Sequence, residues 1–247
     1  MFNLFKNSAS DALPDFSKLS VDLHSHLLPG IDDGAPDMAT SLALIKAMAE
    51  LGYKRLYTTP HVMSAHYPNT RDGILKKRDE VLQCLENKAI NIDHFDAAAE
   101  YFIDETFVTL LKKEPLLCLP GNRVLVEMSF FQPYPELHRV LFDMQMKGYV
   151  PLLAHPERYR YYHSLEDFAG LKHLGCEFQT NILSLIGYYN KAIQAAARLL
   201  MQHDLIDFLG ADLHHARHAE NLRQALTHKS VIQAVNSSQL KNKALLP

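Results

Sequence analysis

The sequence VDLHSHLLPGIDDG, residues 21–34, joins an apolar run to two histidines and a pair of acids. His24 and His26 are two positions apart, and on a β-strand residues i and i+2 point to the same face. Both imidazoles can therefore reach one metal ion. Asp32 and Asp33 follow on a loop with proline and glycine, where a short acid can turn back toward the strand end. An HxH pair alone is a weak signal of a metal site, so its meaning depends on the rest of the chain.

Further apolar runs repeat this arrangement, and helical patterns lie between them. The seven expected strands are LSVDLHS (19–25), RLYTTPH (55–61), HFDAAAEYF (94–102), RVLVEMS (123–129), YVPLLAH (149–155), CEFQTN (176–181) and DFLGADLH (207–214). Capping residues and apolar spacing predict helices from Asp37 to Gly52, after Thr70, over 136–147, after Ser164 with Asp167 completing a capping box, and from Asn190 to near His203.

Repeated strand–helix units predict an α/β fold with parallel strands and right-handed crossovers. No linker or low-complexity stretch divides the chain, so we expect one barrel-like domain over residues 21–247. Residues 1–20 are expected to form an N-terminal extension. The last thirty residues have a helical pattern and are expected to pack outside the barrel.

Composition excludes several classes of protein. The 247 residues carry a net charge of -3, which gives no electrostatic footprint for nucleic acid. The three cysteines form no CxxC pair, so neither a disulfide framework nor a thiolate zinc site is expected, and the compartment is expected to be reducing. The first twenty residues contain no apolar signal-peptide core, and no run of 18 apolar residues exists. A cytoplasmic protein without membrane insertion is therefore expected.

Residues of the metal-ligand type recur at the carboxyl ends of six of the seven expected strands. In a parallel barrel these ends meet at one mouth, where function collects. A single histidine at such an end is more often structural, but a cluster of histidines and carboxylates without cations would be electrostatically costly. The candidate ligands are His24, His26, Asp33, His61, Glu100, Glu127, His155, Asp212 and His214.

A charge count supports divalent metals at this mouth. The positive charge of three divalent ions exceeds the negative charge of the four candidate carboxylates. Arg158 and Arg217 add two further positive charges. The result is a pocket suited to a phosphate dianion. Imidazole and carboxylate ligands without thiolate suit Mn, Fe or Zn, and the oxygen content favours Mn or Fe.

The motifs DLHSHLLPGIDDG, TTPH, AEYF, AHPERY and ADLH, taken together, resemble the polymerase-and-histidinol-phosphatase (PHP) superfamily. Within it they look like the bacterial manganese-dependent tyrosine phosphatases that act on capsule and exopolysaccharide kinases. The resemblance covers about residues 21–217 and implies a distorted seven-stranded (β/α)7 barrel. Many PHP phosphatases have histidine where this chain has Asp33 and Glu127, and carboxylates at these positions fit the tyrosine-phosphatase branch.

The resemblance also implies a role for each candidate residue. It implies a first metal held by His24, His26, Glu100 and Asp212, a second held by Glu100 as a bridge with Glu127 and His155, a third held by Asp33, His61 and His214, and a phosphate gripped by Arg158 and Arg217. Three divalent ions, most often Mn, with Fe or Zn as alternatives, are the implied cofactors.

The implied reaction is hydrolysis of protein phosphotyrosine by attack of metal-bound hydroxide. The implied partner is the tyrosine-phosphorylated tail of a bacterial kinase that regulates polysaccharide synthesis and export. A small-molecule phosphatase, for example one acting on histidinol phosphate, stays open as an alternative. So does a non-catalytic, metal-stabilised module that binds phosphoproteins. A PHP nuclease is disfavoured by the acidic net charge.

Several neighbouring residues have simpler interpretations. Asp22 is expected to be structural, Asp32 to support the loop rather than to bind metal, and His215 and His218 to be solvated neighbours of the site. The aromatic runs FFQPY (130–134) and RYRYY (158–162) either line the rim and stack on an aryl phosphate or pack loops over the mouth.

Overall fold

The computed structural model describes residues 15–86, 88, 90–113 and 115–246. In these residues the strands are β1 Val21–Asp22, β2 Arg55–Thr58, β3 His61–Val62, β4 His94–Ala97, β5 Glu100–Phe102, β6 Arg123–Glu127, β7 Val150–Ala154, β8 Glu177–Asn181 and β9 Phe208–Gly210. The α-helices are α1 Met38–Glu50, α2 Arg71–Glu86, α3 Glu105–Lys113, α4 Leu137–Met146, α5 Leu165–His173, α6 Lys191–Gln202, α7 Ala216–Ala225 and α8 Lys229–Val235. Three 3-10 turns complete the chain: η1 Pro156–Arg158, η2 Ile182–Ile186 and η3 Asn242–Leu245.

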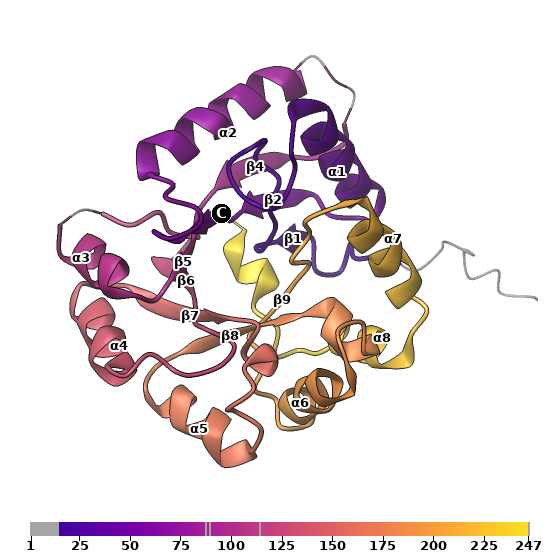
Figure 1. The fold of residues 1–247 in the computed structure, drawn as a ribbon. Helices are drawn as coiled ribbons and strands as arrows, with labels where there is room; N and C mark the ends of the chain where they lie inside the picture. The colour runs from indigo at the N-terminus through magenta and orange to yellow at the C-terminus, as the bar shows by residue number, and fades with distance from the viewer. Residues whose placement is uncertain (1–14, 87, 89, 114, 247) are drawn as a thin grey trace, which may run out of the picture.

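The strands form two sheets in which every pairing is parallel. One sheet has the order β1-β2-β4 and the other β3-β5-β6-β7-β8-β9. Each of the seven predicted strand segments contains at least one of these strands, and helices surround them (Figure 1). The expected α/β fold with parallel strands is therefore confirmed. Two predicted strands are interrupted, the second at Thr59-Pro60 and the third at Ala98-Ala99.

The predicted helix ends agree with the observed caps. Asp37 accepts a hydrogen bond from the Thr40 backbone at the start of α1, and Asn190 does the same for Ile193 at the start of α6. The capping box of Ser164 and Asp167 is present at the start of α5. Each side-chain oxygen satisfies a backbone N–H that has no partner inside its helix.

Helix α3 was not among the expected elements. It is short, nine residues, and its start is set by Asp104, whose carboxylate accepts a hydrogen bond from the Phe107 backbone at 2.8 Å. Phe107 and Leu111 are four positions apart and both are buried. This apolar pair and the capping aspartate are sequence signals of a helix. They were overlooked because the region was interpreted only in terms of its strands.

Alternation along the strands divides the core into two layers. Leu56, Val124 and Leu153 belong to the larger cluster, which also contains the buried faces of the helices. Their strand neighbours Tyr57, Leu125 and Leu152 belong to a smaller cluster in which six of the ten residues lie on strands. Because successive strand residues point to opposite faces, one face of the strands packs on helices and the other faces its counterpart across the fold.

The C-terminal turn η3 enters the inner layer instead of staying outside. Leu245 is 1% exposed and belongs to the smaller cluster. The Asn242 side chain donates to the backbone oxygens of Val21 and Leu209 and accepts from the Leu209 N–H. The turn η3 thus lies in the middle of the ring of helices (Figure 1), which differs from the expectation that the last thirty residues pack outside. The reason is hydrogen bonding: the Asn242 side chain pairs with backbone groups of β1 and β9 that would otherwise be buried without partners.

Residues just before β1 also belong to the packed fold. Phe16 and Leu19 are 0% and 1% exposed, and the Phe16 ring stacks on Tyr53 with centroids 5.3 Å apart. The rest of the expected N-terminal extension, residues 1–14, lies outside the described residues. Within the described ranges, no helix has the length and apolar character needed to cross a membrane.

Candidate metal centre

The carboxyl ends of the strands bring all nine predicted ligands together. His24 and His26 follow β1, and Glu127 ends β6. His61 and Glu100 begin β3 and β5, and two residues separate each of them from the carboxyl ends of β2 and β4, respectively. The others follow β7 and β9 or lie on the loop before α1. Their nitrogen and oxygen atoms form overlapping groups within which every pair is closer than 4.8 Å: His26, Asp33, His61 and His214; His24, His155 and Asp212; His24, His26 and Glu100; and His61, Glu100 and Glu127.

Glu100 lies at the centre of the cluster. One of its oxygens, Oε2, is 3.2 Å from His24 Nε2 and 3.2 Å from His61 Nδ1, and the other is 3.1 Å from His155 Nε2. The side chain is inaccessible to solvent, as are those of His24 and His26. A buried carboxylate needs compensating positive charge, so this position calls for cations or protonated histidines.

Three buried atoms beside Glu100 lack hydrogen-bond partners in the described part of the chain. They are His61 Nδ1, Glu100 Oε2 and Glu127 Oε1. His61 Nδ1 is 3.0 Å from the Glu127 oxygen, so the atoms face one another without hydrogen-bond geometry. Buried polar atoms are almost always paired, and one divalent ion would satisfy all three. The donors present therefore fit a metal.

The ligand groups overlap, so several residues can be assigned to more than one of the sites implied by the PHP resemblance. His61 lies with Asp33 and His214, as in the implied third site, but also with Glu100 and Glu127. His155 is grouped with His24 and Asp212, and its Nε2 atom also lies 3.1 Å from Glu100 Oε1. His155 Nε2 is 4.0 Å from the nearer Glu127 oxygen, a longer separation than that of His61 from the same carboxylate.

Two polar residues outside the ligand groups orient the first two histidines. Gln179 Oε1 is 2.6 Å from His24 Nδ1, and Asp32 Oδ2 is 2.8 Å from His26 Nδ1. The opposite nitrogens, Nε2 in both rings, lie 3.4 Å apart in the cluster. Metal-binding histidines commonly donate their other N–H to such a partner, which sets the tautomer and ring orientation. Asp32 belongs to no ligand group, as expected.

Gln179 was missed by sequence reasoning. The sequence signal was a long polar side chain inside the expected strand 176–181, between Phe178 and Thr180 on β8. Asp22, expected to be structural, is buried and accepts a hydrogen bond from the Ala211 backbone at 2.9 Å.

The negative charge of the cluster shifts its protonation equilibria. Burial disfavours the charged form of His24, but Glu100 and Asp212 outweigh this effect and raise its pKa to about 9. Burial opposes ionisation of Glu100 and Asp212, yet the surrounding histidines hold the pKa of each carboxyl well below its ordinary value. Asp33, which is half exposed, has its pKa lowered to about 2 by His214 and His61 despite partial burial. The cluster therefore attracts positive charge strongly.

The backbone at two candidate ligands is strained. His155 and Asp212 have φ angles of 35° and 49°, in the left-handed region that non-glycine residues rarely adopt. Gly34 is required for a different reason, since an added Cβ would lie 2.1 Å from the carbonyl oxygen of His26. Conformations of this cost persist where the surrounding structure imposes them, commonly at functional sites.

Arg158 forms one wall of a cavity of about 360 Å³ above the cluster. Its guanidinium donates to Asp212 Oδ2 at 3.0 Å and lies 4.6 Å from the ring centroids of both Phe130 and Tyr189. The cavity is lined by Asp33, His61, Glu100, Glu127, Phe130, His155, Arg158, Tyr189, Asp212, His214, His215 and His218.

Arg217 is not brought to this cavity. It lies in the first turn of α7, is exposed, and is absent from the lining among the described residues. The neighbouring histidines reach the cavity instead. His215 is exposed, as expected of a solvated neighbour, and caps α7 by accepting from the His218 backbone, whereas His218 is only 9% exposed.

Relatives with similar sequences and structures are known. Tyrosine-protein phosphatase YwqE of Bacillus subtilis (strain 168) is 29% identical over 200 residues, covering 80% of this chain and 78% of that protein. Tyrosine-protein phosphatase CpsB of Streptococcus agalactiae serotype III (strain NEM316) is 26% identical over 203 residues, covering 78% of this chain and 82% of that protein.

A solved structure gives the same result for the fold. This structure belongs to work on YwqE from Bacillus subtilis and CpsB from Streptococcus pneumoniae, which are described there as unique metal-dependent tyrosine phosphatases. Its TM-score to this chain is 0.76 at 28% identity, and the match covers 85% of this chain and 87% of the other. The profile of a family described as "Capsular polysaccharide synthesis, CpsB/CapC" matches residues 20–239. This chain, with its ligand cluster at the strand ends, belongs to the CpsB/CapC family of capsular polysaccharide synthesis.

Proposed function

We propose that this protein is a metal-dependent phosphatase that hydrolyses phosphotyrosine in proteins. The observation that carries the proposal is the set of buried, unpartnered donors of His61, Glu100 and Glu127 beneath a cavity that also contains Arg158. Such a site joins cation-binding groups to a fixed guanidinium, the combination that phosphate recognition requires. The names of the relatives point to the same reaction.

Three divalent ions, with Mn preferred over Fe or Zn, would be held by the nine residues of the cluster. The donor set supports this proposal because it contains imidazoles and carboxylates without thiolate, a set suited to such ions. When bound, divalent ions supply Lewis-acid charge that stabilises a transferring phosphoryl group.

Arg158 is the residue we assign to the phosphate. Its planar donors match phosphate oxygens, and Phe130 and Tyr189 hold the guanidinium between two rings. The two oxygens of Asp212 face different partners, because Oδ2 accepts from Arg158 while Oδ1 is 3.4 Å from His24 Nε2. This carboxylate thus links the phosphate-binding group to the ligand cluster. The PHP resemblance also assigns Arg217 to the phosphate, but its exposed position outside the cavity lining gives that assignment no support.

The proposed partner is a bacterial tyrosine kinase that takes part in capsule or exopolysaccharide synthesis, phosphorylated on tyrosine in a flexible segment. The family description supports a role in capsular polysaccharide synthesis. Aromatic side chains beside Arg158, including Phe130 and Tyr189, offer apolar surface to the ring of a phosphotyrosine.

A substrate comparison tests this function. Metal-free protein is reconstituted with Mn²⁺, and kcat/KM is measured for a phosphotyrosine peptide, the same peptide with phosphoserine, and histidinol phosphate. The phosphotyrosine peptide is expected to have the highest value. A higher value for histidinol phosphate would establish the small-molecule alternative, and binding without turnover of any substrate would establish the non-catalytic one.

We further propose that the two sheets act as one distorted barrel of seven strands, with β2 and β3 as one strand and β4 and β5 as another. Backbone hydrogen bonds support this arrangement across the breaks, from Ala98 to Thr58 at 2.9 Å and from Glu100 to Pro60 at 3.0 Å. At the seam, His26 N–H donates to the Leu213 oxygen at 2.9 Å.

A further inference from the structure

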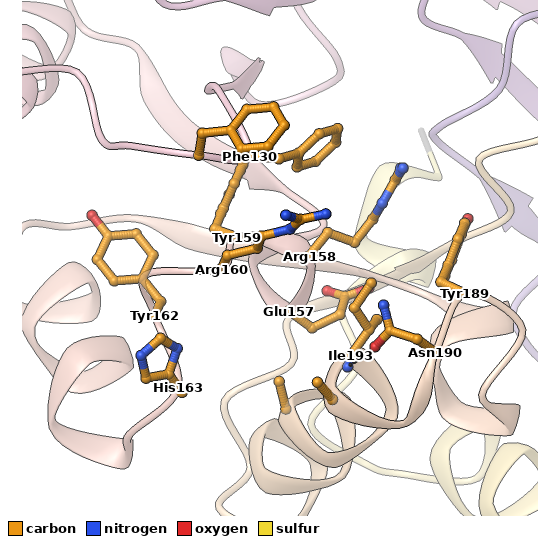
Figure 2. Close-up of a pocket in the computed structure, with 13 residues that line it drawn as sticks. Phe130, Glu157, Arg158, Tyr159, Arg160, Tyr162, His163, Tyr189, Asn190 and Ile193 are labelled. Carbon is orange, nitrogen blue, oxygen red and sulfur yellow. Dashed lines mark hydrogen bonds between the residues drawn. The ribbon is translucent and has the colours of Figure 1, made fainter.

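A second cavity of about 480 Å³ adjoins the one above the metal-ligand cluster. The two share Phe130, Arg158 and Tyr189 as lining residues, so these side chains border both cavities. In Figure 2, Arg158 and Arg160 lie between Tyr162 and His163 on one side and Tyr189 and Asn190 on the other. The second cavity contains none of the nine candidate ligands. It therefore has no part in holding metal and calls for a different explanation.

Rings and short apolar side chains make up most of its wall. Phe130, Phe131 and Tyr162 come from the two aromatic runs, and Ala192 and Ile193 come from the first turn of α6. Phe131 is 74% exposed, which is unusual for a phenylalanine and leaves its ring open to a ligand. A wall of this kind favours an aromatic group.

Arg160 supplies positive charge to this cavity. Its guanidinium carbon lies 5.1 Å from the centroid of the Phe131 ring, and its backbone N–H donates to the Phe130 oxygen at 3.3 Å. Among the described residues, Arg160 takes part in no ion pair, and its guanidinium contacts the Phe131 ring. Arg158 differs, because it is already bonded to Asp212. Arg160 is thus an arginine placed on an aromatic ring with its donors available to an anion.

One carboxylate, Glu157, also lines the cavity and opposes an anion there. It is 2% exposed, and one of its oxygens accepts hydrogen bonds from the Asn181 backbone at 3.0 Å and the Ser184 hydroxyl at 2.6 Å. These bonds hold the carboxylate at the base of the cavity. Arg160 is exposed and occupies the accessible part, where an incoming anion meets it first.

We propose that this second cavity binds another phosphotyrosine, located near the hydrolysed one in the same polypeptide segment. Its ring would pack on Phe131 and Tyr162, and its phosphate would bind Arg160. This proposal rests on the proposed function, since it names a feature of the substrate. An aspartate or glutamate would reach Arg160 but leave the aromatic wall uncovered, and an unmodified tyrosine would leave Arg160 without an anion.

The test uses peptides with one hydrolysable phosphotyrosine and a second position two to four residues away. That position carries tyrosine, glutamate or a non-hydrolysable difluoromethylphosphonate analogue of phosphotyrosine. For the Mn²⁺-loaded wild-type protein, the analogue is expected to lower KM about tenfold relative to tyrosine at the best spacing, with kcat unchanged, since a charge-assisted contact has about this effect. Equal KM values for all three peptides, or an equal effect of glutamate, would overturn the proposal.

Arg160→Gln identifies the residue responsible. The tenfold lower KM of the analogue peptide should disappear in this variant. Turnover of p-nitrophenyl phosphate should stay at the wild-type value, because this substrate is too small to extend from the metal centre into the second cavity. Arg198→Gln is the matched control, since Arg198 is an exposed arginine on α6 outside the lining. It should keep the advantage. An advantage that persists in Arg160→Gln would overturn the assignment.

Failure of the proposed function can be told apart from failure of this inference. If the wild-type protein hydrolyses no phosphotyrosine, the phosphatase proposal fails. Binding of a fluorescent peptide carrying two analogue residues is then measured by anisotropy. Binding about tenfold weaker for Arg160→Gln than for wild type and Arg198→Gln supports the second cavity, and equal binding overturns it.

Discussion

The two ends of the strands carry charged residues in opposite arrangements. At the amino ends, Arg123 bonds to Glu177, Lys172 pairs with Asp207, and Lys241 reaches both acids at 2.9 and 2.8 Å. Every acid there has at least two basic partners. At the carboxyl ends, four carboxylates and five histidines crowd together, and the arginine that bonds to them is Arg158.

The comparison shows at which end the protein's own side chains neutralise the buried charges without a ligand. The amino-end network neutralises itself and attaches the C-terminal segment through Lys241, next to the turn that contains Leu245. The carboxyl-end cluster leaves buried atoms of Glu100, Glu127 and His61 without hydrogen bonds. Buried polar atoms of this kind are costly unless something pairs with them. One end therefore stabilises the fold, and the other is built to receive cations and an anion.

The largest effect is expected from loss of the metals or of the central carboxylate. Chelation should abolish phosphatase activity, and Glu100→Gln should lower kcat/KM by about 1000-fold or more, because Glu100 contacts three histidines of the cluster. Elemental analysis should show reduced metal content in the variant. Circular dichroism verifies its folding, and a folded variant with full metal content and activity would contradict the comparison of the two ends.

Arg158→Ala should lower kcat/KM about 100-fold with metal content retained, since charge-assisted contacts to phosphate contribute a few kcal/mol. The PHP resemblance pairs Arg158 with Arg217, but of the two only Arg158 lines the cavity in the described part of the chain. Arg217→Ala is therefore the control and should change kcat/KM less than about threefold. An equal loss in both variants would show that α7 moves its first turn to the cavity during turnover.

Gln179→Leu should weaken Mn²⁺ binding about tenfold, because it removes the partner that orients His24. The measurement is titration of metal-free protein with Mn²⁺, followed by activity at saturating metal. Recovery of most activity at high Mn²⁺ is expected of a positioning residue. Unchanged affinity would mean that the ring of His24 is held by packing alone.

Asp207→Asn should affect stability and leave activity intact. Removing charge from this largely buried partner of two lysines should cost about 1.5–3 kcal/mol of unfolding free energy at pH 7. Burial raises the pKa of Asp207, but Lys172 and Lys241 outweigh it, so the net pKa lies below the ordinary value of 3.8. Its contribution is therefore full above pH 3.8 and is lost as the pH falls through the lowered pKa. Urea unfolding of both proteins at pH 7 and near pH 3 should show the difference shrinking, whereas a constant difference would exclude an ionic origin.

The smallest effect is expected from the thiols. None of the three cysteines lines the metal cavity, and burial raises the pKa of Cys118 to about 11 and of Cys176 to about 12. Alkylation of the accessible thiols with iodoacetamide should change activity less than twofold. Inactivation by iodoacetamide together with resistance to chelators would overturn the metal-dependent mechanism.

Local sequence was sufficient for much of the fold because the signals involved are short-range. The capping box at Ser164 and the Asn190 cap are decided within one helical turn, and the strand segments follow from runs of apolar residues. Eight of the nine candidate ligands could be named because they sit at or near the end of such a run, and parallel strands place those ends together; Asp33 lies on the loop that follows the first run. The break at Thr59-Pro60 has a sequence signal in Pro60, which cannot donate to a strand ladder, whereas the alanines at the second break carry no such signal.

Sequence by itself therefore determined the α/β class, the strand segments and the ligand types. Tertiary structure decided that Gln179 reaches His24, that Arg217 stays outside the cavity, and that Leu245 enters the inner core. These outcomes depend on distances between residues far apart in the chain, for example the 155 positions between His24 and Gln179. Periodicity and spacing report only which face of its own element a residue occupies, and what it meets there is settled when the elements pack.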